Sequence, residues 1–345
     1  MSVTASTASL TTTATRQRWR FIDALRGFAV FGILLVNAVD LTEIGWARME
    51  ETGIFTPDPI REALYLTVQT RFVPIFILLF GMSLWIVLEG ARTRARRPGL
   101  VMLRRLVGLS AIGGLLMFVY PGNVLVEYGV VGLVMLPVIL FAPRWLTFWV
   151  GLAGTVAAYA LFGGGFPATP GLILLGAGAA AYGLPRLLES STKAVAIVFA
   201  VSAALTVPAL LWQQTTQGDP RFSTPGGVAG LVMAVLYTTG LALLWRTPAR
   251  RVIAAAFEPL GRMALSNYVG AALVVAGAAQ LIDFGHMSSL APLMVLVVAI
   301  IAAQSVLSRL WLKYFVYGPI EWLWRTVTWL RPVAFRRELR AHGRP

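Results

Sequence analysis

The sequence predicts an all-α integral membrane protein with about ten transmembrane helices. The chain has 345 residues, of which 57% are apolar and only 13% are charged, about half the charged fraction of an ordinary soluble domain. Its mean hydropathy is +0.74. A membrane-spanning helix needs roughly 20 predominantly apolar residues, so the apolar residues suffice for about ten spans. These values exclude soluble globular, fibrous, disordered and disulfide-rich secreted proteins.

The charged residues predict the orientation of the chain in the membrane. Lys and Arg number 29 against 15 Asp and Glu, which gives a formal net charge of +14. With the N-terminus in the cytoplasm, most basic residues fall in cytoplasmic loops, whereas the outer loops 40–62 and 213–226 are acidic or turn-rich. The positive-inside rule therefore predicts that both chain ends lie in the cytoplasm. Basic loops also contact anionic lipids, which explains the net charge better than nucleic-acid binding does.

The elements follow in order along the chain. Residues 1–18 are predicted to be disordered, because residues 2–15 are rich in Ser, Thr and Ala. A single polytopic membrane domain is expected at 19–331, and a basic cytoplasmic tail at 332–345. Within the domain, the Trp, Tyr and Gly-Pro residues around 319–330 predict a short interfacial or re-entrant helix. Ten apolar runs are expected to span the membrane: 21–39, 63–88, 101–119, 124–141, 146–162, 169–184, 194–212, 227–245, 259–281 and 288–307.

The residue types also limit the chemistry. The chain has no cysteine and two histidines, which excludes disulfides, thiolate nucleophiles and Cys zinc sites and disfavours a His-rich metal site. No phosphate-binding P-loop, dinucleotide fingerprint or serine-hydrolase motif is present. We therefore expect no metal and no permanently bound cofactor.

Polar residues at the cytoplasmic mouth of the first span form one candidate site, because an ionisable group within a span is costly and marks function. Asp23 and Arg26 are three residues apart, so they share a helix face and can pair. Binding of a substrate is one interpretation of this pair. A stabilising interfacial ion pair is the alternative.

Other polar residues on the cytoplasmic side extend this candidate site. Arg262 and Asn267 open the ninth span, where Glu258 and Arg262 form an i,i+4 pair. Glu321 and Arg325, in the predicted interfacial helix, form a second such pair. Together with Asp23 and Arg26, these residues predict a polar vestibule that binds a substrate.

A second candidate site is expected near the outer surface. Arg71 interrupts the second apolar run, and a buried cation there needs a carboxylate, a ligand phosphate or water. Asn123 and Glu127 lie four residues apart on one helix face, which predicts Glu127 as the counter-ion of Arg71. Asn37 lies roughly 16 Å beyond Arg26 along the first helix. Binding of an anion or a lipid headgroup is one interpretation, and a structural ion pair is the other.

Five blocks of the chain carry a resemblance: RFIDALRGFA at 20–29, the segments 71–82 and 122–133, GRMALSNY at 261–268 and YGPIEWLWR at 317–325. They resemble the YeiB-like family of polytopic bacterial membrane proteins. The first block is similar also to the first helix of the transmembrane acyltransferases, which include the O-acyltransferases of bacterial polysaccharides and heparan-glucosaminide N-acetyltransferase. This resemblance implies a protein of the bacterial cytoplasmic membrane that moves an acyl group from acyl-CoA in the cytoplasm to a lipid-linked or extracytoplasmic acceptor.

The resemblance also implies roles for individual residues. Asp23, Arg26 and Gly27 match the shared acyltransferase pattern, and Asn37 stands where the polysaccharide O-acyltransferases carry a His base. We therefore expect Glu127 and Asn37 to be the catalytic residues, with Glu127 or a carboxylate from another helix as the general base. Two alternatives stay open: a transporter or flippase of a lipid or small anion, and a non-catalytic membrane scaffold.

Overall fold

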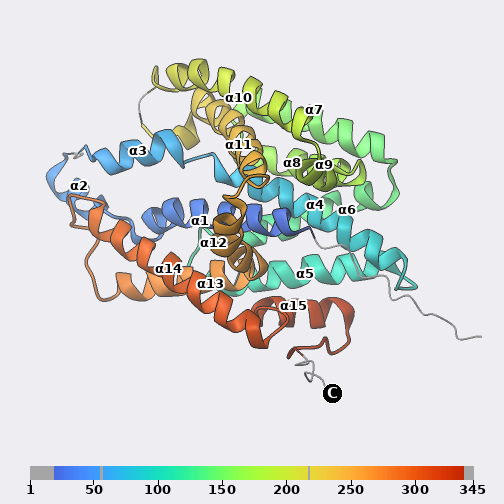
Figure 1. Cartoon of the computed structure of the whole chain (residues 1–345). Coiled ribbons are helices and arrows are strands. Elements are labelled where there is room, and N and C mark those ends of the chain that lie inside the picture. Colours follow the sequence, from blue (N-terminus) through green and yellow to red (C-terminus); the bar gives the residue numbers. More distant parts are fainter. Residues whose placement is uncertain (1–18, 55–56, 217, 338–345) are drawn as a thin grey trace, which may run out of the picture.

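The computed structural model describes residues 19–54, 57–216 and 218–337, and every regular element in these residues is a helix (Figure 1). The predicted disordered segment 1–18 and the end of the tail at 338–345 lie outside the described residues. In the described part, seven helical segments are long and apolar enough to cross a membrane, or nine if each of two bent helix pairs is one span. The all-helical membrane class is therefore confirmed, with seven to nine candidate spans against about ten predicted.

Each predicted apolar run overlaps at least one helix. The described residues form fifteen α-helices: α1 (Arg20–Thr42), α2 (Trp46–Thr52), α3 (Pro59–Thr67), α4 (Phe72–Arg92), α5 (Pro98–Leu116), α6 (Leu125–Phe141), α7 (Arg144–Phe162), α8 (Thr169–Ala181), α9 (Leu184–Ser190), α10 (Thr192–Gln213), α11 (Thr224–Leu244), α12 (Arg250–Arg262), α13 (Ala264–Ala279), α14 (Ala291–Tyr314) and α15 (Pro319–Trp329). Two short 3-10 helices, η1 (Phe166–Ala168) and η2 (Pro220–Phe222), precede α8 and α11.

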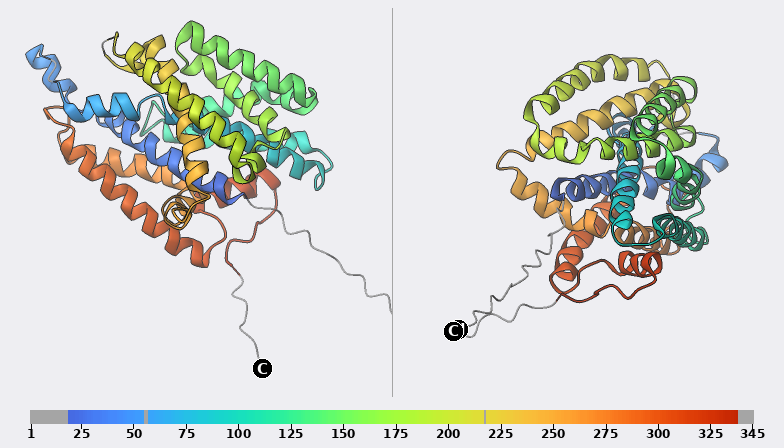
Figure 2. Two further views of the ribbon diagram at one scale, coloured as in Figure 1. Left: turned by 45° about the horizontal axis from the view of Figure 1, so that its top comes forward. Right: turned by 90° about the vertical axis from the view of Figure 1, so that its right-hand side faces the viewer.

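Helix α1 is the central element of the bundle. It lies between a group that includes α7, α10 and α11 and a group formed by α13, α14 and α15 (Figures 1 and 2). Its closest partner is α12, and glycines on both helices permit the approach. A Cβ atom at Gly27 would lie 2.0 Å from the carbonyl oxygen of Phe257, and one at Gly261 would lie 1.8 Å from that of Asp23. The two backbones are therefore in direct contact.

Two predicted runs are bent rather than straight. The segment from Phe166 to Ala181 meets α9 at 68°, and α12 meets α13 at 80°. In the first bend Gly183 has a φ of 81°, a left-handed conformation that glycine adopts without strain. The run 259–281 therefore contains the end of α12 as well as α13, because hydropathy alone does not show a change of direction.

The predicted short helix at 319–330 is present as α15. Its indole at Trp324 donates a hydrogen bond to the carbonyl oxygen of Arg105 at 2.7 Å. The guanidinium of Arg105 lies 3.7 Å from the centre of the same ring, a favourable cation–π contact. These contacts fix α15 against α5.

Apolar side chains cover the outside of the bundle. The most apolar stretch of α10 is only 11% buried, and it exposes Leu205, Val207 and Leu211. A continuous exposed apolar surface of this kind marks contact with lipid or with another protein. In a membrane protein, the hydrocarbon core of the lipid bilayer covers such an apolar surface.

Candidate binding cavity beside α3

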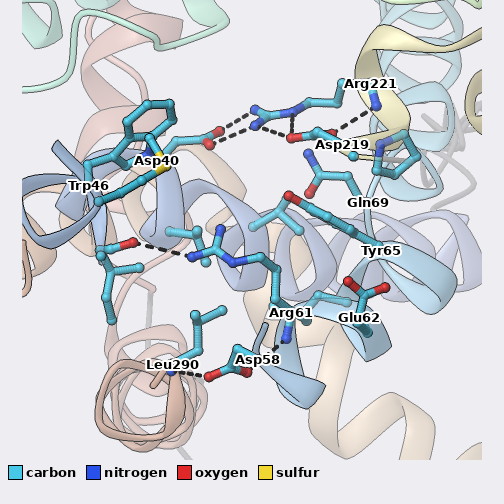
Figure 3. Close-up of a pocket in the computed structure, with 18 of the residues that line it drawn as sticks. Asp40, Trp46, Asp58, Arg61, Glu62, Tyr65, Gln69, Asp219, Arg221 and Leu290 are labelled. Carbon is cyan, nitrogen blue, oxygen red and sulfur yellow. Dashed lines mark hydrogen bonds and ion pairs between the residues drawn. The ribbon is translucent and has the colours of Figure 1, made fainter. Parts of the chain in front are cut away.

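A large cavity lies at the end of the bundle where α1 ends (Figure 3). It has a volume of about 1320 Å³ and is lined by the end of α1, by α2, α3 and η2, and by the loop 287–290 before α14. Ligand pockets typically measure roughly 300–1,000 Å³, so this space, called the α3 cavity below, accommodates a lipid headgroup or a short glycan.

An ion cluster forms one wall of the α3 cavity (Figure 3). The guanidinium of Arg221 in η2 donates to both carboxylate oxygens of Asp40, at 2.6 and 3.0 Å, and to Asp219, at 2.6 and 2.9 Å. Burial by itself lowers the pKa of Arg221, but the two carboxylates raise it above its usual value. The cluster therefore joins the end of α1 to the loop between α10 and α11 through a permanent cation.

Asp58 fixes the opposite wall. Its carboxylate accepts hydrogen bonds from the N–H groups of Ile60 at 2.7 Å and Arg61 at 3.1 Å, which caps α3, and from the N–H of Leu290 at 2.8 Å. Burial raises the pKa of Asp58, yet these three backbone donors outweigh it and lower the pKa below its ordinary value. Asp58 therefore stays ionised and ties α3 to the start of α14.

Two glutamines form the floor, and a buried arginine that does not itself line the cavity lies behind them. The side-chain amide of Gln213 donates to the carbonyl oxygen of Tyr65 at 3.0 Å and accepts a hydrogen bond from Arg71. Gln69 lines the cavity with only 5% of its surface exposed, and its side-chain amide makes no hydrogen bond to any described residue. Its backbone carbonyl accepts from Arg71.

Arg71 itself is completely buried, with 0% exposure. Its guanidinium donates to the carbonyl oxygen of Gln69, the hydroxyl of Thr70 and the amide oxygen of Gln213, and it contacts the sulfur of Met233 at 3.4 Å. All four partners are neutral, and Arg71 makes no ion pair within the described part of the chain. A buried cation without a carboxylate is unusual, because desolvation is costly unless an anion compensates it.

The predicted ion pair between Arg71 and Glu127 is wrong. The carboxylate of Glu127 accepts a hydrogen bond from the hydroxyl of Thr169 at the start of α8. Arg71 instead contacts Gln213 of α10 and Met233 of α11. The two charges lie near the same end of the bundle but face different neighbours, which the linear sequence does not show.

Asn123 and Asn37 also lie outside the α3 cavity. The amide of Asn123 donates to the carbonyl oxygens of Gly113 and Tyr120, at 3.2 and 2.9 Å, and its oxygen accepts from the N–H of Leu125 at 3.2 Å. Asn123 therefore closes the turn before α6 instead of contacting a ligand. Asn37 faces a separate cavity of about 20 Å³, large enough for a single water molecule. Glu127 lines neither space.

The polar residues at the other end of the bundle connect helices. The predicted pair is present between Asp23 and Arg26, at 3.2 Å, and Arg26 also donates to the carbonyl oxygen of Gly261 at 3.4 Å. Arg262 donates to the carbonyl oxygen of Val316 at 3.3 Å. These bonds link α1, α12 and the segment before α15.

The predicted pair of Glu321 and Arg325 does not form. Glu321 accepts from the N–H groups of Leu265 and Ser266, at 2.7 and 3.0 Å, whereas the guanidinium of Arg325 lies 4.4 Å from the ring centre of Tyr317. The N–H groups in the first turn of α13 therefore hold the Glu321 carboxylate against α13, so that it does not pair with Arg325 on its own helix.

Asn267 is buried as well, and its contacts are structural. Its amide donates to the carbonyl oxygen of Leu260 at 3.2 Å and to the hydroxyl of Ser308 at 3.1 Å. None of the predicted residues at this end of the bundle lines either cavity.

The polar residues of the α3 cavity were not predicted from the sequence, because 40–62 and 213–226 have the composition of ordinary outer loops. The available signal was Arg221, the one basic residue of 213–226, facing a strongly acidic loop at 40–62. The described residues contain no group of three or more His, Cys, Asp or Glu side chains that could hold a metal ion. The polar and aromatic side chains that line the α3 cavity carry guanidinium, carboxylate, amide, hydroxyl and aromatic groups.

Comparisons with known proteins found a matching family and several similar bacterial proteins. Residues 185–331, from α9 through α15, match the family described as "Protein of unknown function (DUF418)". The chain is 29% identical to an "uncharacterized 39.9 kDa protein in amylase 3'region" of Bacillus acidopullulyticus, over 92% of this chain and 96% of that protein. It is 26% identical to the uncharacterized protein YeiB of Escherichia coli K12, over 89% of this chain and 95% of YeiB. The YeiB-like resemblance is confirmed.

A second Bacillus relative extends the match. The uncharacterized protein YxaH of Bacillus subtilis strain 168 is 26% identical to the chain, over 95% of this chain and 98% of YxaH. No solved structure matches the chain. The similarity to these relatives covers nearly the whole sequence.

Proposed function

We propose that this YeiB-like protein binds the polar part of a lipid or lipid-linked molecule in the α3 cavity, at the outer face of the bacterial cytoplasmic membrane. The observation that carries the proposal is the cavity itself, which has a volume of about 1320 Å³ and lies at one end of an apolar bundle. Ligand sites of membrane proteins gather polar groups in such water-accessible spaces, because polar groups are costly elsewhere in the bilayer.

The proposed arrangement in the membrane has ten spans with both chain ends in the cytoplasm. It counts α6 as a span, although α6 has only 17 residues, and it counts one helix from each bent pair. The basic loop 92–97 and the basic C-terminal region then lie inside, and the α3 cavity lies outside. The positive-inside rule supports this orientation.

The lining suits an amphipathic ligand. Aromatic side chains of Trp46, Tyr65 and Phe222 stand beside the charged groups of the cavity, and Trp and Tyr are favoured at the level of lipid headgroups. Apolar side chains of Leu64 and Leu66 continue the wall. A ligand with a polar head and an apolar tail therefore meets matching surfaces.

Native mass spectrometry tests this proposal. The purified protein is offered phosphatidylethanolamine, phosphatidylglycerol or diglucosyldiacylglycerol in mixed micelles, and we expect at least one of them to be retained. Ser288→Trp places a bulky ring into the cavity from an exposed lining position and should abolish retention. Ser190→Trp makes the same change at an exposed position at the other end of the bundle and serves as the control. Failure to retain any lipid, or equal retention by both variants, would overturn the proposal.

Acyl transfer to the bound molecule is a second candidate function. The partly exposed pair of Asp23 and Arg26, at the end of the bundle opposite to the α3 cavity, favours it, because an acyl-CoA donor would enter from the cytoplasm. The proposed catalytic roles of Glu127 and Asn37 have no support from the cavity, which neither residue lines. Native mass spectrometry with acetyl-CoA and longer acyl-CoAs tests the candidate. Specific binding that Arg26→Ala removes would support acyl transfer, and no binding with an intact fold would exclude it.

A further inference from the structure

Charge is distributed unevenly between the mouth and the floor of the α3 cavity. At the mouth, the side chains of Glu43, Glu50 and Glu62 are exposed, and they make no ion pair with a described residue. The lining cations Arg48 and Arg61 offset two of these three charges. The mouth therefore retains a net negative charge.

The carboxylates deeper in the wall are already compensated. Asp40 and Asp219 both pair with Arg221, and Asp58 accepts three backbone N–H groups. None of these three groups is free to bind the positive part of a ligand. An ammonium group would therefore be attracted to the exposed glutamates of the mouth.

The floor of the α3 cavity has a positive electrostatic potential, opposite in sign to the charge of the mouth. The side-chain amide of Gln69 is 5% exposed, lines the cavity and has no hydrogen-bond partner among the described residues. Behind it, the charge of Arg71 is hydrogen-bonded to the Gln69 backbone and meets only neutral groups. Arg71 also stands at the N-terminal end of the 21-residue helix α4, where the helix dipole adds positive potential. The floor thus offers a hydrogen-bond donor in a positive field, which suits an anion.

We propose that the α3 cavity binds a zwitterionic phosphoethanolamine group. The phosphodiester occupies the floor at Gln69, in the field of Arg71, and the ammonium lies toward Glu43, Glu50 and Glu62. This inference rests on the proposed lipid-binding function and specifies the class of its ligand. In the proposed orientation the order of charges matches a phospholipid, because the phosphate of phosphatidylethanolamine lies nearer the bilayer than its ammonium does.

The charge pattern disfavours the other headgroups. The glutamates of the mouth repel a purely anionic headgroup such as that of phosphatidylglycerol, and a neutral glycolipid leaves the positive potential of the floor uncompensated. We therefore expect wild-type protein in native mass spectrometry to retain phosphatidylethanolamine about tenfold better than either phosphatidylglycerol or diglucosyldiacylglycerol.

Gln213→Glu tests the floor without deleting a side chain. The new carboxylate keeps the shape of Gln213 and the acceptor oxygen that Arg71 already contacts, so it neutralises the cation in place. We expect phosphatidylethanolamine retention to fall about tenfold. Gln280→Glu adds the same charge at an exposed position that does not line the cavity, and should change retention less than twofold.

The mouth is tested separately by the triple substitution of Glu43, Glu50 and Glu62 with Gln. Because these residues are exposed, the fold should persist, and the preference for phosphatidylethanolamine over phosphatidylglycerol should disappear. Soluble glycerophosphoethanolamine is added as a competitor to distinguish a membrane lipid from a free headgroup. We expect no displacement at equal concentration, because the lipid gains affinity from its chains; full displacement would identify the free phosphoethanolamine as the ligand.

The outcomes separate this inference from the function on which it rests. Loss of every lipid in wild-type protein overturns lipid binding itself. Retention of diglucosyldiacylglycerol or phosphatidylglycerol as strongly as phosphatidylethanolamine, with loss in Ser288→Trp, leaves lipid binding intact and overturns the phosphoethanolamine site. Equal effects of Gln213→Glu and Gln280→Glu overturn the assignment of the phosphodiester to the floor.

Discussion

The carboxylate of Glu321 connects two helices by acting as a cap. It accepts the N–H groups of Leu265 and Ser266, at 2.7 and 3.0 Å, where α13 begins, and it also accepts the Ser266 hydroxyl. An anion is favoured at a helix N-terminus, and hydrogen bonds to a charged acceptor are stronger than neutral ones. We expect Glu321→Gln to lower the free energy of unfolding by about 1–2 kcal/mol, measured by unfolding of the purified protein in detergent.

A matched substitution on the surface provides the control. Glu89 pairs with Arg92 at 2.6 Å, but its side chain is 51% exposed. Solvent screens such a pair, so Glu89→Gln should change the free energy of unfolding by no more than about 0.5 kcal/mol. An equal loss of stability in both variants would argue against the cap.

His286 is expected to respond to pH. Its two ring nitrogens lie 3.2 Å from Glu51 of α2 and 2.6 Å from Asp283, and hydrogen bonds and attraction from these carboxylates raise the pKa of His286 above its ordinary value. The contact between α2 and this loop is therefore fully formed below the unfolded-state pKa of about 6.5. It is lost as the pH rises through the raised pKa of the folded protein.

Nuclear magnetic resonance measures this titration directly. The chain has two histidines, so His342→Gln leaves a single imidazole signal from His286. We expect its midpoint above about 6.5, and closer to 6.5 once Glu51→Gln and Asp283→Asn remove the neighbouring charges. A midpoint that these two substitutions leave unchanged would refute the contact.

At the scale of single residues, the sequence identified unusual polar side chains but not their partners. Asn123 and Glu127 are polar residues in an apolar setting, as predicted, yet their groups bind the backbone near Gly113 and the hydroxyl of Thr169. A polar group in an apolar environment takes the nearest available partner, and that partner depends on helix rotation and tilt. The positions of Gln69 and Gln213 at the cavity floor were not predictable from the sequence for the same reason, because they result from helix packing.

Among the helices, the contact of α1 with α12 depends on glycine. Because a Cβ atom at Gly27 would lie 2.0 Å from the Phe257 carbonyl oxygen, Gly27→Ala must move the two backbones apart. We expect the free energy of unfolding to fall by about 1–3 kcal/mol or more. Gly277 of α13 has no atom within 4 Å of an added Cβ, so Gly277→Ala should instead be neutral or stabilising by up to about 1 kcal/mol. Thermal unfolding of both variants checks the prediction, and two equal losses would contradict it.

The positions of the helices were more predictable than their directions. The run 227–245 corresponds closely to α11 (Thr224–Leu244), because Ser223 caps its start and the apolar composition then continues without a break. The run 259–281 gave no indication of the 80° bend between α12 and α13. Hydropathy measures compatibility with lipid, whereas a bend depends on backbone angles at Met263 and on packing against α1.

For the molecule as a whole, the uneven distribution of basic residues makes the orientation testable. The chain has no cysteine, so each introduced cysteine is a unique label site. Glu50→Cys lies at the mouth of the α3 cavity and Arg96→Cys lies in the loop between α4 and α5, and both positions are exposed. If both chain ends are cytoplasmic, a membrane-impermeant maleimide should label Glu50→Cys in intact cells and Arg96→Cys only after permeabilisation. The reverse pattern would place the α3 cavity in the cytoplasm and would exclude an extracytoplasmic ligand.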